Sequence, residues 1–261
     1  MKTVLITGGS SGIGLEMSTY FAKDGYAILW VSLLDEELQA AKVALQQAVP
    51  GVVIEMMALD LSQAGAAQKT YDWVVANQWQ LDVLINNAAF GTFGFANGMP
   101  LDKEVAMIQL NAVTVFELTR LFLKDMLARD AGYIINISSN SSFQPVPKMA
   151  AYSATKAFVK HYSQGVAEEL KALNSKVKVM TVCPGPIKDT PFKEVANMQK
   201  LKTFSGMTAT TKEEVAKDVW RAFQAGKTFI ATGARLRLSM LLQAVLPDAA
   251  VQFILRRELS E

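Results

Sequence analysis

The sequence predicts a single α/β domain whose core is a doubly wound sheet of about seven parallel strands, covered by helices on both faces. Its 261 residues suit one domain of this class, and a hydrophobic content of 51% is enough to fill a large core. Short β-branched runs alternate along the chain with longer segments whose apolar residues recur every three or four positions. Alternation of this kind is typical of parallel strands joined by right-handed helical crossovers.

Seven short apolar runs are expected to form the strands of that sheet. They are residues 3–7, 27–31, 52–59, 83–86, 133–138, 177–182 and 228–232. Between the fourth and fifth runs, six positions at helical spacing are expected to form one stripe against the sheet: Val105, Ile108, Ala112, Val115, Thr119 and Phe122. We find no internal repeat or linker in the sequence, so we expect one domain over residues 1–261.

The charge balance and the cysteine content limit the partners and the compartment. With 26 basic and 24 acidic residues, the net charge of +2 gives no broad field that would attract nucleic acid. Cys183 is the only cysteine, which excludes an internal disulfide and disfavours a structural zinc site. We therefore expect a reducing, cytoplasmic setting, no bound metal and no nucleic-acid partner. No membrane span is expected, because the most apolar late stretch, 236–255, is interrupted by charged residues and Pro247.

The first chemical motif is a glycine-rich loop directly after the first expected strand. Residues 7–14 read TGGSSGIG, and Gly8, Gly12 and Gly14 let the backbone turn tightly and approach a diphosphate. The N-terminus of the following helix offers unpaired N–H donors and a favourable dipole for that anion. The spacing differs from GxGxxG, and a glycine-rich turn can also serve only to connect two elements, so this motif alone leaves both interpretations open.

The second motif is the pair Tyr152 and Lys156. Four helical residues advance about 400°, which leaves the two side chains roughly 40° apart on one face, so both can reach one substrate. The alternative is a buried tyrosine beside a lysine whose stem lies along apolar surface, an arrangement common in proteins. Without the other motifs, the spacing favours this second, structural interpretation.

Taken in order, the motifs resemble those of the short-chain dehydrogenase/reductase family, in its compact single-domain branch, over about residues 2–233. Residues 7–14 resemble the family's TGxxxGIG loop, Asp60 and Leu61 its adenine-contacting pair, and residues 86–88 its NNAG motif. Ser139 precedes Tyr152 by the usual thirteen residues, and Asn111 falls where the family has its catalytic asparagine. The resemblance implies a Rossmann-type fold and an NAD(P)-dependent oxidoreductase that interconverts a carbonyl and an alcohol.

The resemblance also implies a catalytic set of Asn111, Ser139, Tyr152 and Lys156. Tyr152 would protonate the carbonyl oxygen in reduction and act as the base in oxidation, while hydride leaves or reaches nicotinamide C4. The ammonium of Lys156, which would also bond the nicotinamide ribose, and a positive nicotinamide are expected to favour the phenolate. Ser139 would orient the substrate oxygen, and Asn111 would belong to a water-mediated proton relay.

The expected cofactor contacts come from the glycine loop and from the turns after several strands. They are Gly8, Ser10, Ser11, Gly12, Ile13, Gly14, Leu33, Asp60, Leu61, Asn87, Ala88, Ala89, Tyr152, Lys156, Pro184, Gly185, Ile187 and Thr190. Leu33 occupies the place where an acid would bind the 2′-hydroxyl of NAD, or an arginine the 2′-phosphate of NADP; Asp35 comes two residues late. Because no carboxylate stands there to repel phosphate, NADP(H) is favoured, with NAD(H) as the alternative.

Three positions depart from the family pattern. Ala89 replaces the last glycine of NNAG, which adds one methyl group beside the cofactor. Ser142 stands where the family often has glycine, and it is expected to give the pocket a longer polar rim. Thr190 lies one residue later than in the common PGxxxT pattern, which leaves its contact with the nicotinamide open. His161 and Cys183 are expected to have structural roles.

The substrate side is expected to involve residues 187–210 and a C-terminal extension, 235–261. Phe192, Met198 and Phe204 suit a lid over a small to medium lipophilic substrate, and simple packing is the alternative. The extension could complete this lid, form a subunit contact or touch a membrane surface. The resemblance implies a homodimer or homotetramer formed through the fourth and fifth helices, with the apolar runs 113–122 and 157–170. A cofactor-binding sensor or scaffold without turnover is the alternative function.

Overall fold

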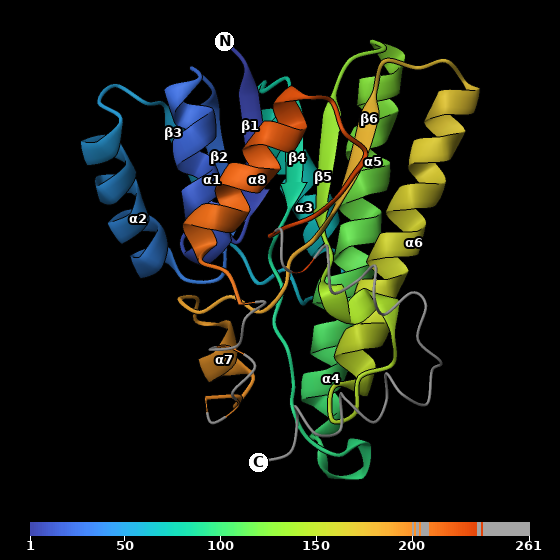
Figure 1. Ribbon diagram of the computed structural model, residues 1–261. Coiled ribbons are helices and arrows are strands. Elements are labelled where there is room, and N and C mark those ends of the chain that lie inside the picture. Colours follow the sequence, from blue (N-terminus) through green and yellow to red (C-terminus); the bar gives the residue numbers. More distant parts are fainter. Residues whose placement is uncertain (200, 202–203, 205–208, 234–235, 237–261) are drawn as a thin grey trace.

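The computed structural model describes residues 1–199, 201, 204, 209–233 and 236 (Figure 1). Its centre is a seven-stranded sheet in the order β3-β2-β1-β4-β5-β6-β7, and every neighbouring pair is parallel. The strands are β1 (Thr3–Thr7), β2 (Ala27–Ser32), β3 (Ile54–Ala58), β4 (Val83–Asn86), β5 (Tyr133–Ile137), β6 (Lys178–Cys183) and β7 (Phe229–Ala231). The predicted doubly wound α/β fold is confirmed, and the predicted strand ends are correct to within two residues.

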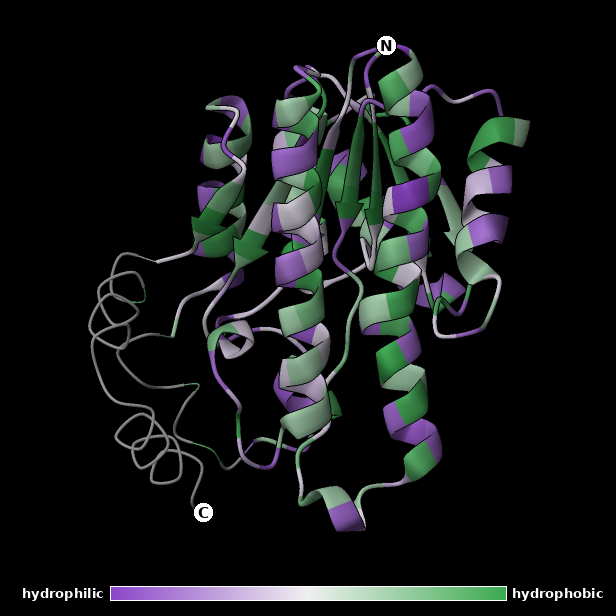
Figure 2. Ribbon diagram, turned by 90° about the vertical axis from the view of Figure 1, so that its right-hand side faces the viewer, coloured by the Kyte–Doolittle hydropathy of each residue, from purple (hydrophilic) through white to green (hydrophobic). Residues whose placement is uncertain are grey.

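Helices cover both faces of the sheet. The described helices are α1 (Gly12–Lys23), α2 (Asp35–Ala48), α3 (Ala66–Ala76), α4 (Leu101–Ile108), α5 (Val115–Ala128), α6 (Ala150–Ala172), α7 (Phe192–Val195) and α8 (Lys212–Gln224). Short 3-10 turns span Ala96–Gly98 and Asn140–Phe143. Figure 2 shows mostly hydrophobic strands and helices in which hydrophobic and hydrophilic residues alternate. The buried apolar side chains of the helices pack against the strands.

The two layers of core follow from the alternation of side chains along the strands. In β1, Val4 and Ile6 pack with α1, α2 and α8, whereas Leu5 packs with α3, α5 and α6 on the other face. All five residues of β1 are buried, because a parallel strand covered on both faces has no solvent side. Each fully buried Leu or Ile stabilises such a core by roughly 1.5–3 kcal/mol, so the central strands hold the loops at their ends in place.

The direction of winding reverses between β1 and β4. The chain runs outward from β1 to β2 and β3, then returns to pair β4 with the other side of β1, with Val4 opposite Val83. In open parallel sheets, the crevice beyond the carboxyl ends of the strands at this reversal is where ligands bind. The topology therefore selects the carboxyl edge of β1, β4 and β5 as the place for a site.

One expectation about the helices is wrong. Val105 and Ile108 were expected in the stripe against the sheet, but they are 55% and 42% exposed, and Met107 is fully buried instead. A π-helical segment, Gln109–Thr114, separates α4 from α5 and shifts the phase of the apolar stripe. In addition, α4 extends past the carboxyl edge of the sheet (Figure 1), so it has no strand to cover.

The helical run Leu101–Ala128 is long and apolar enough to cross a membrane by length and composition. Its second half is a core helix, because Leu118, Phe122 and Met126 are buried with side chains of the sheet. Of the expected lid, residues 187–199, 201, 204, 209 and 210 are described, whereas the expected C-terminal extension lies outside the described residues except for Leu236.

Candidate active site

A cavity of about 710 Å³ lies at the carboxyl edge of the sheet, where the topology places a site. Most residues expected to contact a cofactor or a substrate line it. These are Gly8, Ser10, Ser11, Gly12, Ile13, Leu33, Asp60, Leu61, Asn87, Ala88, Ala89, Ser139, Tyr152, Lys156, Pro184, Gly185, Ile187 and Thr190. Two expected residues, Gly14 and Asn111, do not line the cavity, and both lie just behind its wall.

The glycine loop forms one end of the cavity. Gly8 and Gly12 have φ values of +64° and +53°, which L side chains rarely adopt. A Cβ on Gly14 would lie 2.2 Å from the carbonyl oxygen of Gly8, so Gly14 serves close packing of α1 on the loop rather than contact with a ligand. Helix α1 begins at Gly12, and its N-cap residue Ser11 makes no side-chain capping bond, which leaves backbone donors for an anion.

The turn after β4 ties this loop to the neighbouring strand. The Asn87 side-chain amide donates hydrogen bonds of 3.0 Å to the carbonyl oxygens of Thr7 and Gly8. The Thr7 hydroxyl in turn accepts from the backbone N–H groups of Asn87 and Ala88, each at 3.0 Å. Asn87 and Thr7 therefore fix a narrow cradle whose glycines leave no side chain in the way, which fits a dinucleotide diphosphate.

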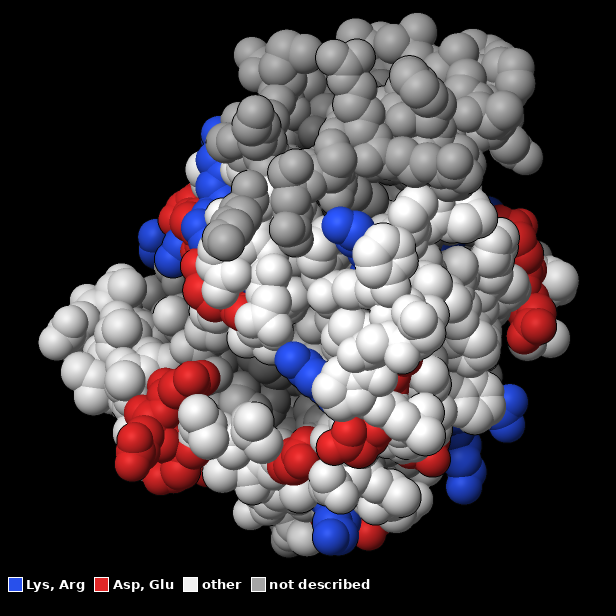
Figure 3. All heavy atoms as spheres, turned by 90° about the horizontal axis from the view of Figure 1, so that it is seen from below, with Lys and Arg blue, Asp and Glu red and all other residues white. Residues whose placement is uncertain are grey.

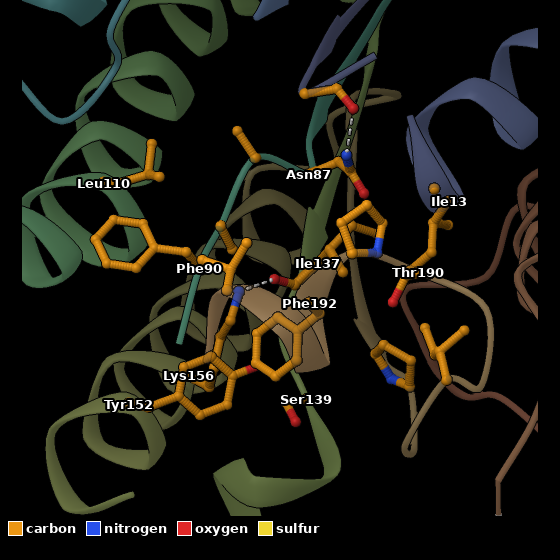
Figure 4. Close-up of a pocket in the computed structure, with 18 of the residues that line it drawn as sticks. Ile13, Asn87, Phe90, Leu110, Ile137, Ser139, Tyr152, Lys156, Thr190 and Phe192 are labelled. Atoms are coloured by element: carbon orange, nitrogen blue, oxygen red, sulfur yellow. Dashed lines mark hydrogen bonds between the residues drawn. The ribbon is translucent and has the colours of Figure 1, made fainter. Parts of the chain in front are cut away.

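Tyr152 and Lys156 lie on one face of α6 and project into the cavity (Figure 4). The Lys156 ammonium is 5.9 Å from the centre of the Tyr152 ring. It donates a hydrogen bond of 3.0 Å to the carbonyl oxygen of Ile137 at the end of β5. Both side chains are buried, with 8% of Tyr152 and 3% of Lys156 exposed, so Lys156 does not extend to solvent as the structural interpretation of the pair requires.

Burial changes the proton affinity of both groups. It raises the pKa of Tyr152 to about 12, and the Ser139 hydroxyl offsets part of that rise. It lowers the pKa of Lys156 to about 8, because the charged ammonium is desolvated. The pKa of Tyr152 is therefore raised by desolvation, whereas the sequence-based expectation was a lowering by the Lys156 ammonium and a positive nicotinamide. A neutral phenol at pH 7 is the form that can donate a proton.

Ser139 has two roles in this structure. It is the N-cap of the 3-10 turn Asn140–Phe143, where its hydroxyl accepts from the Ser141 N–H at 3.1 Å, and it also lines the cavity. The expectation that Ser142 extends the polar rim is wrong. The Ser142 hydroxyl is buried, donates to the Ser139 carbonyl oxygen at 2.6 Å and faces Cys183 instead of the cavity.

Asn111 lies in the π-helical segment and is fully buried. Its side-chain amide donates to the carbonyl oxygen of Phe90 at 2.8 Å and its carbonyl accepts from the Phe90 N–H at 3.2 Å. It also donates to the Thr155 hydroxyl at 3.4 Å, on the turn of α6 between Tyr152 and Lys156. Asn111 thus joins the loop after β4 to α6, and its part in a proton relay stays a prediction.

Comparison with known proteins agrees with this geometry. Residues 2–201 match the family model described as short chain dehydrogenase. The chain belongs to the short-chain dehydrogenase family. It is therefore an oxidoreductase, with the parallel sheet and the ordered motifs that the sequence predicts for that family.

Individual relatives differ in how much they share with this short-chain dehydrogenase. This chain is 30% identical over 223 residues to the NADP-dependent 3-hydroxy acid dehydrogenase YdfG of Salmonella typhi. The aligned residues make up 83% of this chain and 87% of the relative. This chain is 26% identical to the very-long-chain 3-oxoacyl-CoA reductase of Mycosarcoma maydis, over 82% of this chain but 59% of that longer relative. A short-chain dehydrogenase from Sphingobium yanoikuyae in complex with NADPH superposes with a TM-score of 0.81 at 26% identity, over 94% of this chain and 93% of the other.

The other half of the cavity of this short-chain dehydrogenase is apolar. Its described walls come from the loop after β4, the π-helical segment, the loop before α6, the segment after β6 and the residues after β7. They include Phe90, Leu110, Val146, Met149, Phe192, Val195, Met198, Phe204 and Leu236. The Phe192 ring lies 5.4 Å from that of Tyr152, at a tilt of 55°. The prediction from the sequence included Phe192, Met198 and Phe204 but missed Phe90, which directly follows the residues similar to NNAG.

We call the part of the cavity around Leu33 and Asp60 the adenosine end, because these residues are expected to lie beside the adenosine of a cofactor. This end contains one residue that the prediction missed. Leu33 is 62% exposed and lines the cavity, as expected. Glu37, on the first turn of α2, also lines the cavity and accepts a hydrogen bond of 3.3 Å from the Ser10 hydroxyl. No pattern of glycines or paired motifs marks Glu37, because the sequence shows only three consecutive acids at the start of a helix.

The two residues expected to be structural, Cys183 and His161, do not line the cavity. Cys183 is fully buried at the end of β6, and burial raises the pKa of its thiol, which disfavours a nucleophilic thiolate. His161 is exposed on α6 and is not part of the cavity lining.

Proposed function

We propose that this chain interconverts a carbonyl compound and an alcohol, with Tyr152 as the general acid and base and NAD(P) as the hydride carrier. The observation that carries the proposal is the burial of Tyr152 and Lys156 together in one cavity that continues into the glycine cradle. A proton donor and a cofactor cradle in one cavity are what hydride transfer to a carbonyl requires.

In the reducing direction, Tyr152 Oη donates its proton to the substrate oxygen, and Ser139 Oγ orients that oxygen by a hydrogen bond. A nicotinamide cofactor held by the glycine cradle would supply the hydride to the carbon of the same group. Lys156, held by the Ile137 carbonyl oxygen, keeps a positive charge near the phenolate that forms. The raised pKa of Tyr152 supports this direction, because a neutral phenol is ready to donate at pH 7.

The substrate we propose is small to medium in size and lipophilic. Aromatic and aliphatic side chains form the walls beside Tyr152, and Lys156 is the only Lys, Arg or His among the described lining residues. A carboxylate or phosphate on the substrate would therefore lack a described partner beyond the reacting centre. The relatives named above act on 3-hydroxy acids and on very-long-chain 3-oxoacyl-CoA. The first class to test is therefore an uncharged compound that carries a 3-oxo or 3-hydroxy acyl group on an apolar chain.

Some observations support NADP(H) as the cofactor and another supports NAD(H). The relatives whose names or complexes include NADP(H), and the absence of an acid at Leu33, support NADP(H). Glu37 at the adenosine end supports NAD(H).

A turnover experiment tests the proposal. The purified chain is mixed with NADH or NADPH and a panel of aldehydes and ketones, or with the oxidised cofactors and secondary alcohols, and absorbance of the reduced nicotinamide is followed. Turnover by the native chain and its loss in Tyr152→Phe are expected. Cofactor binding without turnover of any member of the panel would instead favour the sensor or scaffold alternative.

We further propose a cytoplasmic homodimer or homotetramer. The apolar runs expected to form the contact lie largely on α5 and α6, where Phe116 and Phe158 are partly exposed. The Phe158 ring stacks on that of Tyr162, and the Phe116 ring contacts the same ring at a tilt of 59°. This exposed aromatic face supports a subunit contact. Light scattering on the purified chain measures the assembly, and a monomer would contradict the proposal.

A further inference from the structure

Glu37 comes from α2, but its carboxylate lies against the glycine loop. Its Oε2 accepts a hydrogen bond of 3.3 Å from the Ser10 hydroxyl. The backbone N–H of Ser10 in turn donates a hydrogen bond of 3.4 Å to the hydroxyl of Ser32, which is the last residue of β2. This chain of contacts holds the Glu37 carboxylate at the cavity wall, five residues beyond the end of the strand.

A second carboxylate lies on the same side, but its oxygens have local partners. Asp60 accepts from the Ser62 N–H at 2.9 Å and from the Ser62 hydroxyl at 2.6 Å through Oδ1, and from Gln63 at 2.9 Å through Oδ2. These bonds lower the pKa of Asp60, so it is ionised at neutral pH. A carboxylate has about four acceptor sites, and Glu37 has one recorded bond, which leaves Glu37 with capacity to accept from a ligand.

No described cation balances these acids at the adenosine end. Lys156 is the only Lys, Arg or His among the described residues that line the cavity, and it is bonded to Ile137 at the other end. Acidic side chains gather beside the hollow on the α2 side of the face seen from below (Figure 3). A phosphate monoester carries roughly −1.5 to −2 charges at pH 7, and it would meet Glu37 instead of a guanidinium.

We infer that Glu37 selects the cofactor: its carboxylate accepts from the adenosine ribose hydroxyls of NAD(H) and repels the 2′-phosphate of NADP(H). The inference rests on the proposed function, because it concerns the cradle for the dinucleotide. It reverses the preference predicted from Leu33, since the deciding carboxylate reaches the cavity from α2 and not from the end of β2.

Direct binding tests the inference without any substrate. The full chain, Glu37→Gln and Glu37→Arg are titrated with NADH and with NADPH, and both dissociation constants are measured by nicotinamide fluorescence. We expect the native chain to bind NADH about tenfold more tightly than NADPH, or about 1.4 kcal/mol. Glu37→Gln should bring the two constants within about threefold, because the charge is lost, and Glu37→Arg should favour NADPH.

Glu36→Gln is the matched control. Glu36 lies on the same first turn of α2 but is not part of the cavity lining, so its removal should leave the ratio of the two constants unchanged. Ser10→Ala should reduce the preference less than Glu37→Gln does, since it removes only the donor that holds the carboxylate.

The outcomes separate the inference from the proposed function. Tighter binding of NADPH by the native chain, or an unchanged ratio in Glu37→Gln, would overturn the role of Glu37 and leave the proposed oxidoreductase reaction standing. Failure of the native chain to bind either cofactor would overturn both. Glu37 is exposed on the helix surface, so thermal unfolding of the glutamine variant should match that of the native chain.

Discussion

The two ends of the cavity differ in how their polar groups are held. At the reacting end, Tyr152 and Lys156 are buried on one long helix, and desolvation shifts the pKa of both. At the adenosine end, Glu37 is exposed and is held by a single hydroxyl of the glycine loop. Burial changes the proton affinities of Tyr152 and Lys156 on α6, whereas the exposed Glu37 carboxylate on α2 can affect only which cofactor binds. Catalysis and cofactor choice should therefore respond to different substitutions.

The largest expected effect separates the two ends directly. Tyr152→Phe removes the proton donor, so kcat should fall by about 10²–10⁴-fold, the range for general acid catalysis. The dissociation constants for NADH and NADPH should change by less than about threefold, because the adenosine end is untouched. Stopped-flow turnover and fluorescence titration on one preparation measure both. Retention of kcat would show that the proton comes from elsewhere.

The next comparison tests which serine acts at the reacting end. Ser139→Ala removes a hydroxyl that lines the cavity, and kcat/KM should fall about 10²-fold, as for loss of one oriented donor. Ser142→Ala removes a hydroxyl that faces Cys183, so it should change kcat/KM by less than about threefold. Equal losses in the two variants would mean that the turn, and not the Ser139 hydroxyl, is required.

A third substitution tests the cradle. Gly14→Ala places a Cβ 2.2 Å from the Gly8 carbonyl oxygen, and the overpacking should lower the free energy of unfolding by about 1–3 kcal/mol and weaken cofactor binding. Gly165→Ala on α6 is the control. Its Cβ would meet nothing within 4 Å, so the helix should become more stable by about 0.5–1 kcal/mol. Denaturant unfolding measures both, and an unaffected Gly14→Ala would contradict the tight contact.

The smallest expected effect is a decline of the reductive kcat/KM at high pH, as Lys156 loses its charge. Burial lowers the pKa of Lys156 to about 8, so its charge is present below that pH and is lost as the pH rises through it. The reductive kcat/KM should fall to about half near pH 8 and continue to fall above it. A pH profile from 6 to 9.5, with thermal unfolding at each pH, measures this. A flat profile would mean that the Lys156 charge does not contribute.

Much of the fold follows from the sequence because period and burial are local signals. Each of the seven strands lies where an apolar run predicts it, since strands covered on both faces need continuous apolar residues. Only the first two positions of the predicted stripe, Val105 and Ile108, were wrong, because the π-helical segment Gln109–Thr114 shifts the phase of the stripe and the sequence gives no signal for that segment. The same segment carries Asn111, whose bonds to Phe90 join residues from separate elements.

By itself, the sequence determined the order of strands and helices, the glycine loop and the helical pairing of Tyr152 with Lys156. Each of these depends on residues that are close in the chain, where spacing alone decides geometry. The tertiary structure alone decided that desolvation raises the pKa of Tyr152, that Ser142 turns away from the cavity, and that Glu37 lies beside Ser10. These depend on contacts between segments that are separate in the chain, because burial and the approach of a hydroxyl to a carboxylate exist only once the sheet has brought its strand ends together.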